Sequence, residues 1–168
     1  MSSFFVSTDS DLTTDRLALR PWSAEVVKAV LDDIRSAHWA DDFPAEGDRV
    51  IAGFISEHLD AALGEFGQRL IVERRTGLVV GSIGLFWPPS DGVLEMGYGI
   101  VGSRRGRGYA TEATRAMVEF ALSAPGVHTV SAGAELNNPA SVRVLEKCGF
   151  ERHGVDQGTA LFRITTTI

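Results

Sequence analysis

Apolar residues recur along this chain with two spacings, one typical of strands and one typical of helices. The helical spacing of three or four residues is clear after Ser23, at positions Val26, Val27, Val30, Leu31 and Ile34. Short apolar runs bounded by Gly, Pro or Asp predict strands instead. The predicted strands are residues 17–20, 68–73, 78–87, 93–101 and 128–136, with the final strands within 150–164. The other predicted helices cover about 48–64, 109–124 and 139–147.

The order of these elements predicts the fold class. A strand, two helices, three strands, a helix, a strand, a helix and final strands indicate an α/β protein with one mixed sheet. We expect a mainly antiparallel sheet of about six to seven strands with helices on both faces. Residues 88–92, which contain two prolines and a glycine, are predicted to form a loop. No repeat or linker interrupts residues 1–168, so a single domain is expected.

Composition and charge narrow the class of protein. The 168 residues include 16 Lys and Arg against 22 Asp and Glu, a net charge of −6, which excludes a generally basic nucleic-acid binder. The single cysteine, Cys148, allows no internal disulfide. Residues 1–12 lack the features of a signal peptide, and no apolar stretch is long enough to cross a membrane. We therefore expect a cytoplasmic monomer or small oligomer, such as a homodimer, without nucleic-acid or membrane partners.

The segment 104–113 carries the strongest chemical signal. Three arginines and two glycines occur within residues 104–108, between a predicted strand and a predicted helix. Glycine lets backbone N–H groups approach a ligand closely, and a helix start adds free N–H groups and a positive dipole. Four arginines but one acid, Glu112, lie between Arg104 and Arg115. The segment therefore predicts a site for a polyanion such as pyrophosphate, the alternative being an exposed turn with solvated arginines.

Two nucleotide-binding motifs do not explain this segment, and two kinds of reactive site are not expected elsewhere in the chain. No Gly-Lys-Ser or Gly-Lys-Thr occurs, so a Walker A loop is excluded. The glycines within 97–102 match Gly-x-Gly-x-x-Gly, but the residues between them continue a strand and the helical pattern begins only near Tyr109. The four histidines lack the spacing of metal ligands, and Cys148 lies near the end of a helix with an apolar stripe and lacks a paired histidine in its sequence context. No metal and no cysteine nucleophile are expected.

The segment does match the pattern Arg-x-x-Gly-x-Ala, through Arg105, Gly108 and Ala110. On this pattern the chain resembles the GNAT superfamily of acyl-CoA-dependent N-acetyltransferases. It is most similar to the branch that includes the ribosomal-protein N-terminal acetyltransferases. The resemblance covers nearly the whole chain, through residues 14–20, 81–84, 95–100, 105–113 and 138–150.

The resemblance implies acetyl-CoA as co-substrate and a GNAT fold, in which two neighbouring parallel strands splay apart. Here these strands are 93–101 and 128–136, and the pantetheine arm is expected to pair with the first of them like a partial extra strand. Many relatives have a proline near Gly102, so a softer loop is expected here. The residues implied in cofactor binding are Tyr98, Ile100, Val101, Arg105, Gly106, Arg107, Gly108, Tyr109, Ala110, Thr111, Asn138 and Ser141.

For catalysis, the resemblance implies direct attack of a neutral amine on the thioester. Glu95 is the candidate general base, because strand alternation places it beside Gly97 and Gly99, which leave room for an acceptor. The alternative is a strand Glu that only faces solvent. Many relatives carry a tyrosine acid where this chain has Leu145. Ser141, acting with Tyr98, is therefore the candidate acid for the leaving thiolate. The alternative is a serine that only caps its helix.

The loop between the first two predicted helices is expected to line the acceptor side. It contains Trp39, Asp41, Asp42 and Phe43, and a carboxylate there would attract a cationic amine. The expected acceptor is a protein N-terminal amine or a small-molecule amine. Two alternatives stay open, an antibiotic- or polyamine-type acetyltransferase on the same scaffold and a non-catalytic CoA-binding sensor or scaffold.

Overall fold

The computed structural model describes residues 10–166, except the side chains of residues 60 and 61. Its strands are β1 (Leu12–Thr13), β2 (Leu17–Pro21), β3 (Gln68–Glu73), β4 (Leu78–Ser90), β5 (Val93–Ile100), β6 (Thr129–Glu135), β7 (Glu151–Asp156) and β8 (Thr159–Thr165). Its helices are α1 (Ala24–Leu31), α2 (Glu46–Glu57), α3 (Leu59–Ala62), α4 (Tyr109–Leu122) and α5 (Pro139–Lys147), with a short 3-10 helix, η1, at Gly102–Arg104.

These strands form one eight-stranded sheet in the order β1-β2-β3-β4-β5-β6-β8-β7. Every neighbouring pair is antiparallel except β5 and β6, which are parallel. The predicted α/β class and mixed, mainly antiparallel sheet are confirmed. The sheet exceeds the predicted size because β1 has only two residues, too few to show a hydrophobic alternation.

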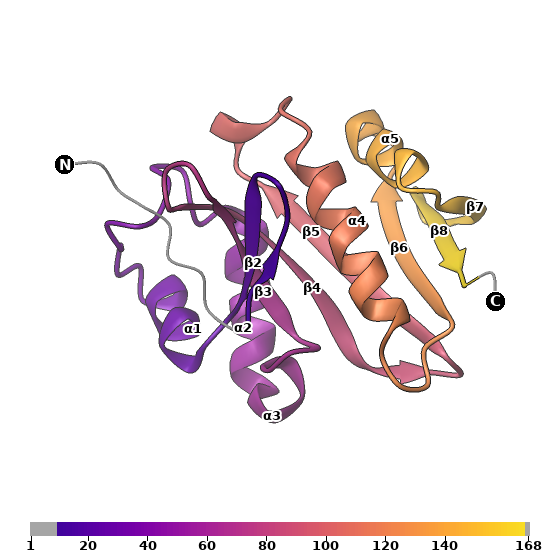
Figure 1. Ribbon diagram of the computed structural model, residues 1–168, viewed down its shortest axis with the longest axis horizontal. Helices are drawn as coiled ribbons and strands as arrows, with labels where there is room; N and C mark the ends of the chain where they lie inside the picture. Colours follow the sequence, from indigo (N-terminus) through magenta and orange to yellow (C-terminus); the bar gives the residue numbers. More distant parts are fainter. Residues whose placement is uncertain (1–9, 167–168) are drawn as a thin grey trace.

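Helices cover both faces of the sheet, with α4 in front of β4 and β5 and α2 behind the sheet (Figure 1). Strand alternation explains how β5 serves both sides. Leu94 and Met96 are buried, whereas Glu95 between them points to the opposite face and is exposed. A single strand therefore supports the core on one face and offers polar and small residues on the other.

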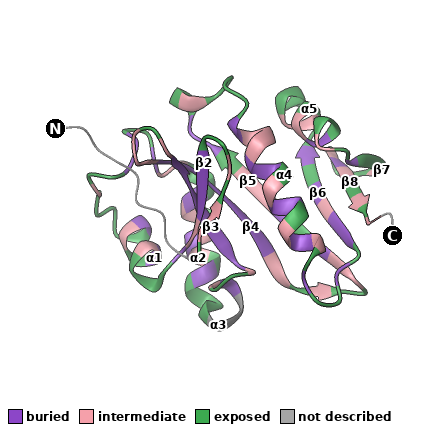
Figure 2. Cartoon of the chain, in the orientation of Figure 1, coloured by how far each residue is buried: buried purple, intermediate pink, exposed green. Residues whose placement is uncertain are grey.

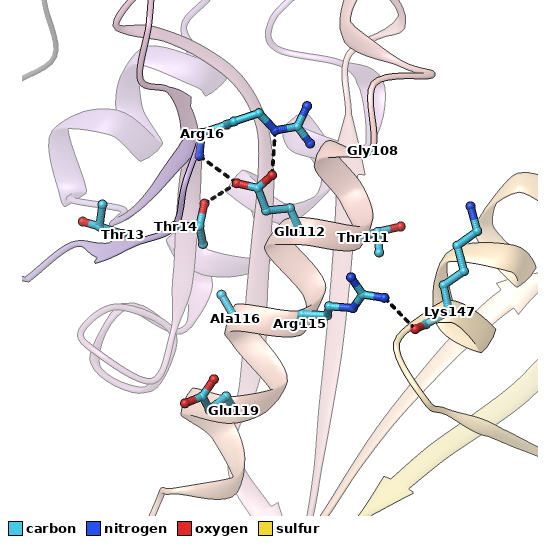
Figure 3. A pocket seen from close by; sticks show the side chains of 10 residues that line it. All are labelled: Thr13, Thr14, Arg16, Gly108, Thr111, Glu112, Arg115, Ala116, Glu119 and Lys147. Atoms are coloured by element: carbon cyan, nitrogen blue, oxygen red, sulfur yellow. Dashed lines mark hydrogen bonds and ion pairs between the residues drawn. The ribbon is translucent and has the colours of Figure 1, made fainter.

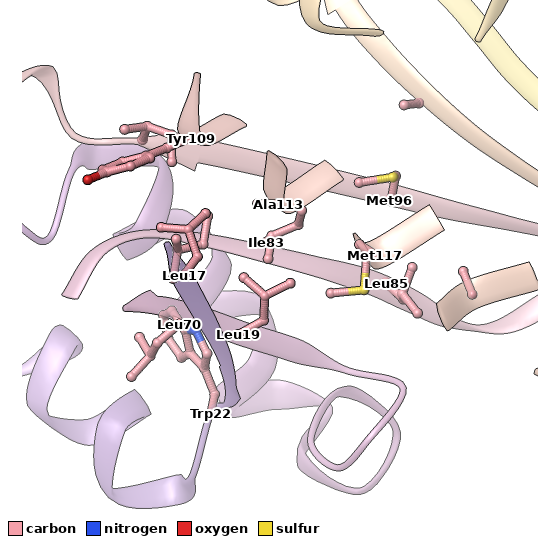
Figure 4. Close-up of a cluster of buried hydrophobic side chains, with 14 of the residues drawn as sticks. Leu17, Leu19, Trp22, Leu70, Ile83, Leu85, Met96, Tyr109, Ala113 and Met117 are labelled. Atoms are coloured by element: carbon pink, nitrogen blue, oxygen red, sulfur yellow. The ribbon is translucent and has the colours of Figure 1, made fainter. Parts of the chain in front are cut away.

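The core between the sheet and α4 holds the start of that helix in place. Leu19, Ile83 and Met117 are fully buried there, and Ala113 has no side chain large enough to keep α4 away from the strands (Figure 4). Figure 2 shows that buried residues concentrate in the central strands and exposed residues on the outer surface. Burying a large aliphatic side chain stabilises a fold by about 1.5–3 kcal/mol. The position of the N-terminus of α4 is therefore fixed by packing against the sheet.

Helix α2 differs from the prediction of one helix over about 48–64. It begins at Glu46, because the buried carboxylate of Asp48 accepts the N–H of Ala45 at 2.8 Å and closes the first turn. The same carboxylate accepts the hydroxyl hydrogen of Ser82 on β4 at 2.6 Å. His58, with φ −138°, interrupts the helix, and the separate turn α3 follows. Burial raises the pKa of Asp48, against the opposing effect of its hydrogen bond from Ser82.

The loop predicted at residues 88–92 is also wrong in part, because β4 continues through both prolines to Ser90. Proline lacks an N–H and is poorly tolerated in a regular ladder. Here the register with β5 is broken between Phe86 and Ser90, so the prolines lie where pairing is already irregular. Only Asp91 and Gly92 form the turn, with φ values of 52° and 80°.

Candidate active site

The central parallel pair of strands opens into a gap. β5 and β6 pair only at Val93 with Thr129, Leu94 with Val130 and Glu95 with Ser131. Beyond these residues β5 continues to Ile100 along β4, and β6 continues to Glu135 along β8. The separation of the two strands predicted from the resemblance is therefore present, and it leaves one edge of β5 without a strand partner.

Backbone alternation indicates which residues of β5 face the gap. The N–H of Val101 donates to the carbonyl of Val80 on β4, at 2.9 Å. Every second residue of a strand shares this direction, so Tyr98 and Ile100 direct their backbone groups to the opposite, open side. The carbonyl of Val101 also accepts the N–H of Arg104 at 3.0 Å. Both backbone groups of Val101 thus have partners inside the protein, and its pairing with the cofactor stays a prediction.

Two predicted residues meet across this gap. The hydroxyl of Tyr98 on β5 lies 2.7 Å from the hydroxyl of Ser141 on α5 and donates to the Ser141 carbonyl at 3.3 Å. The N–H of Ser141 in turn donates to the side-chain oxygen of Asn138, at 3.3 Å, which makes Asn138 the N-cap of α5. Burial raises the pKa of the Tyr98 hydroxyl, although its bond to Ser141 opposes the change. A protonated hydroxyl pair therefore stands at the open edge of β5.

The loop between β5 and α4 presents its backbone. Gly106 and Gly108 have φ values of +78° and +82°, a region that favours glycine. Gly108 is the N-cap of α4 and no side chain caps this helix, so the N–H groups of its first turn lack an intrahelical acceptor. These N–H groups and the helix dipole suit a phosphate.

The arginine side chains of this loop turn toward the protein. The Nε of Arg104 donates to the carboxylate of Glu73 at 3.2 Å, and a guanidinium nitrogen of Arg107 lies 3.9 Å from it. The Nε of Arg105 donates to the carbonyl of Ile100 at 3.0 Å. The positive charge seen in the sequence of this loop is therefore used, at least in part, for bonds within the protein. Glu73 lies outside every motif and was not predicted.

A second acidic residue, Glu112, ties α4 to the turn between β1 and β2 (Figure 3). Its carboxylate accepts the hydroxyl hydrogen of Thr14 at 2.6 Å and the N–H and Nε–H of Arg16 at 2.9 and 2.7 Å. Arg16 also donates to the carbonyl of Arg107 at 2.8 Å, and its guanidinium lies over the Tyr109 ring, 4.7 Å from the centroid. Burial raises the pKa of Glu112, but these hydrogen bonds outweigh it and the pKa falls below its usual value.

A cavity of about 630 Å³ runs along the outer surface of α4 from this cluster. Gly108 and Thr111 line it at the start of α4, and Arg115 and Lys147 line it farther on (Figure 3). A guanidinium nitrogen of Arg115 donates to the carbonyl of Lys147 at 3.1 Å and so joins α4 to α5. The cavity continues the N–H-rich loop into a region with two exposed cations.

The other face of β5 contains the candidate base. Glu95 is exposed, and it has no hydrogen bond or ion pair within the described range. Phe86 on β4 pairs with Glu95 in register, and its ring lies 3.6 Å from where a Cβ would stand at Gly97. Phe54 of α2 contacts Phe86 edge to face, with centroids 6.2 Å apart. Glu95 thus lies opposite Phe86, and Phe54 packs against that ring from α2, an arrangement that sequence reasoning missed because it joins separate elements.

The loop predicted to line the acceptor side contains two buried aromatic residues and two exposed aspartates. Trp39 and Phe43 are buried in the core and pack edge to face, with ring centroids 5.2 Å apart. Their packing stabilises the loop. Asp42 accepts the N–H and the hydroxyl hydrogen of Ser103 on η1, both at 2.8 Å. These bonds outweigh the effect of burial and lower the pKa of Asp42. Asp41 is exposed, and the role of both aspartates toward an acceptor stays a prediction.

Residues 10–166 contain no group of three His, Cys, Asp or Glu side chains placed to hold a metal ion. Over the same residues, no helix is long and apolar enough to cross a membrane. Cys148 is half-buried, and its sulfur lies 3.6 Å from the carbonyl of Thr111. Burial raises the pKa of this thiol, although Arg115 opposes the change, so the neutral thiol is favoured.

Comparison with known sequences points to one family. A family model described as an acetyltransferase (GNAT) domain matches residues 16–151. The uncharacterized N-acetyltransferase YjdG of Bacillus subtilis is 34% identical over 86 residues, which are 51% of this chain and 51% of that protein. The chain spans about half the length of the curated relatives it matches.

Two solved structures from Vibrio cholerae share the fold. One, provisionally named a ribosomal-protein-serine acetyltransferase, is 18% identical, with a TM-score of 0.65 over 96% of this chain and 100% of that one. The other, a dodecameric spermidine N-acetyltransferase, is 16% identical, with a TM-score of 0.64 over 90% of this chain and 95% of that one. At these identities the likeness concerns the fold alone. The family match, which covers most of the chain, shows that this protein belongs to the acetyltransferase (GNAT) domain family.

Proposed function

We propose that this protein transfers the acetyl group of acetyl-CoA to a primary amine. The observation that carries the proposal is the gap between β5 and β6, because it opens at the end of β5 that leads into the glycine-rich loop. An arm with amide groups can pair with the free edge of β5, while a pyrophosphate lies against the N–H groups of the loop. Acetyl-CoA combines both features, and membership of the family supports the same choice.

Each part of the site would hold a different part of this co-substrate. The backbone of Tyr98 and the N–H of Ile100 would face the pantetheine arm, while the Ile100 carbonyl is bonded to Arg105. The N–H groups from Gly106 into the first turn of α4 would face the pyrophosphate. Thr111 is placed to add its hydroxyl, because it lies in the first turn and lines the cavity. The two cations farther along the cavity, Arg115 and Lys147, suit a further phosphate on the nucleotide end.

Glu95 is proposed to take the proton of the amine, directly or through one water molecule. An α-amino group has a pKa of about 8, so a carboxylate needs to give only modest help, whereas a lysine amine at about 10.4 needs more. The exposed carboxylate and the rings of Phe86 and Phe54 together offer a charge and an apolar surface to an incoming cation.

The Tyr98 and Ser141 hydroxyls are proposed to supply a proton at the opposite end of the reaction. Acetyl-CoA provides the activated thioester, and its transfer leaves a thiolate that must be protonated or solvated. The hydroxyl pair lies at the open edge of β5, and the raised pKa of Tyr98 keeps it in the donating form at neutral pH.

The acceptor is proposed to be an amine next to an apolar group, either a protein N-terminus or a small amine. The two neighbouring structures from Vibrio cholerae are named for one acceptor of each kind, so the fold allows both. The aromatic rings beside Glu95 favour an acceptor that carries apolar carbon near the amine.

Titration calorimetry with CoA tests the cofactor half of this proposal. We expect one CoA per chain, and Gly106→Ala should weaken binding because alanine disfavours the φ of +78°. Gly158→Ala is the matched control, since Gly158 has a φ of +80° and the same open surroundings but lies in the β7–β8 turn. If the wild type binds no CoA, the proposed function is wrong.

A turnover assay tests the transfer half. Release of free thiol from acetyl-CoA is measured with a panel of peptides with free N-termini, spermidine and aminoglycosides. Turnover of peptides alone indicates a protein N-terminus, and turnover of the small amines alone indicates the other class. CoA binding without turnover of any amine would favour the non-catalytic alternative.

A further inference from the structure

Glu73 is a carboxylate with no exposed surface, and it contacts the loop between β5 and α4, residues 101–108, here called the cofactor loop after its proposed role. It is the last residue of β3 and is 0% exposed. The residues directly before Glu73 in β3, Leu70 to Val72, are apolar. A buried carboxylate is costly unless it is paired or hydrogen-bonded, so Glu73 needs polar partners from other segments. The partners come from the loop and from the turn after β3.

Two hydrogen-bond donors and one further cation reach Glu73 from the loop between β5 and α4 and from the start of α4. The hydroxyl of Tyr109, the first residue of α4, donates to Oε2 at 2.7 Å. The Nε of Arg104 donates to the same oxygen at 3.2 Å, and a guanidinium nitrogen of Arg107 lies 3.9 Å away. One buried oxygen atom thus connects the beginning, the middle and the end of the loop.

The turn after β3 completes the environment of the carboxylate. The hydroxyl of Thr76 donates to Oε1 at 2.7 Å, and Arg75 approaches Oε2 at 3.7 Å with a side chain that is 65% exposed. Burial raises the pKa of Glu73, but the bonds from Tyr109 and Thr76, with the nearby arginines, outweigh it and hold the pKa below its usual value. The group is therefore a carboxylate at neutral pH.

We propose that Glu73 is a positioning residue for the anion-binding loop, a role that rests on the proposed function. By holding Arg104 and Tyr109, it fixes the backbone between them, which includes Gly106 and Gly108. The N–H groups of that backbone can then face a pyrophosphate without first being ordered, and this lowers the entropic cost of binding.

Removing the charge of Glu73 has two opposing effects on a polyanionic ligand. Loss of a nearby negative charge favours binding of a polyanion, and because Glu73 is buried, salt screens this effect only weakly. Loss of the anchor leaves Arg104 and Arg107 without their carboxylate and frees the loop, which disfavours binding. The second effect is the larger one because the site acts through backbone positions and misplacement of such groups is costly.

The test measures the affinity for CoA of full-length variants at 0.15 M salt. Glu73→Gln is expected to raise the Kd about tenfold, and Tyr109→Phe, which keeps every charge, about threefold. A readout specific to the loop is the KM for two acetyl donors. The KM for acetyl-CoA should rise in Glu73→Gln, whereas the KM for acetylpantetheine, which lacks the pyrophosphate, should not change.

Two control variants separate positioning from general damage to the fold. Asp48→Asn makes the same acid-to-amide change in another buried, hydrogen-bonded carboxylate, on α2, and should leave the CoA Kd unchanged. Arg75→Ala removes a cation near Glu73 that is outside the loop, and should also leave it unchanged.

The outcomes are distinct. Unchanged or tighter CoA binding by both Glu73→Gln and Tyr109→Phe overturns the role of Glu73, and so does an equal rise of KM for both acetyl donors. If the wild type itself fails to bind CoA, the proposed function is overturned and the role of Glu73 falls with it.

Discussion

The two sides of β5 are built in opposite ways. On the proposed cofactor side, two acidic residues that lie largely within the protein, Glu73 and Glu112, receive hydrogen bonds from the loop, from α4 and from the turn between β1 and β2. On the acceptor side, Glu95 and Asp41 are exposed and have no polar partner in the part of the chain that the structure describes. One side is fixed before any ligand arrives, and the other is open.

The difference follows from what each side is proposed to bind. A pyrophosphate has a constant shape and charge, so a backbone site gains affinity from being rigid in advance. An amine acceptor is small at its reacting atom and variable beyond it, and an exposed carboxylate beside aromatic rings suits this variety. We expect substitutions on the cofactor side to change binding, and substitutions on the acceptor side to change turnover.

The largest expected effect comes from a negative charge inside the rigid site. Gly108→Glu should weaken CoA binding at least about 100-fold, because a carboxylate repels the pyrophosphate and the φ of +82° disfavours any side chain. Gly158→Glu is the control, with the same kind of φ but a distant turn. Calorimetry gives both constants, and a similar loss in the two variants would show that backbone strain alone is responsible.

The next effect should appear on the open side. Glu95→Gln is expected to lower kcat about 30-fold, a modest general-base effect because an α-amine is already partly neutral near pH 7. The Kd for CoA should not change, since Glu95 points away from the buried face of β5. Equal kcat values for the variant and the wild type would mean that this glutamate only faces solvent.

A smaller effect is expected where the two sides meet. Tyr98→Phe should lower kcat about tenfold, since it removes the hydroxyl that lies 2.7 Å from Ser141. Ser141→Ala should have a similar effect, and the double variant should lose little more, because the two groups act as one unit. Additive losses in the double variant would show independent roles, and an altered KM for acetyl-CoA alone would indicate a binding role.

The hydrogen bonds of Glu112 on the cofactor side should also make the free energy of unfolding depend on pH. The pKa of Glu112 is lowered in the folded state, so its stabilising effect is present above its unfolded pKa of about 4.3 and is lost as the pH falls through the folded value. Glu112→Gln should therefore unfold more easily by about 1 kcal/mol at pH 7, with a smaller difference from wild type at pH 3. Urea denaturation at both pH values measures this, and a constant difference would contradict it.

The smallest effect is expected at the far end of the cavity. Lys147→Ala should weaken CoA binding about threefold, as is typical of one exposed cation near a phosphate. If Lys147 contacts the 3′-phosphate, the same substitution should not change the Kd for dephospho-CoA. Equal losses for both ligands would place the contact elsewhere.

Local signals made several elements predictable from the sequence. The helix predicted at 139–147 coincides with α5, because Asn138 caps it, proline occupies its first position and a glycine follows it. The start of α4 was predicted for a similar reason, since the glycine-rich loop ends where the helical spacing begins. Both signals lie within a few residues of the feature that they determine.

Signals from distant segments explain the errors. The start of α2 depends on Asp48, whose carboxylate also bonds to Ser82 on β4, and the extension of β4 through its prolines depends on its register with β5. The burial of Trp39 and Phe43 likewise depends on segments that pack against them, and their place near an acceptor stays a prediction. Nothing in the neighbouring sequence records these contacts.

The sequence by itself determined the fold class, the family and the glycine-rich loop at the start of α4, because these depend on local spacing and turn chemistry. Only the tertiary structure decided how the charges of that loop are used. Glu73 and Arg104 are 31 positions apart along the chain and become partners only when β3 and the loop meet. Since Arg104 and Arg107 approach this buried carboxylate, the backbone is left to face the proposed ligand, and no pattern of neighbouring residues could have shown it.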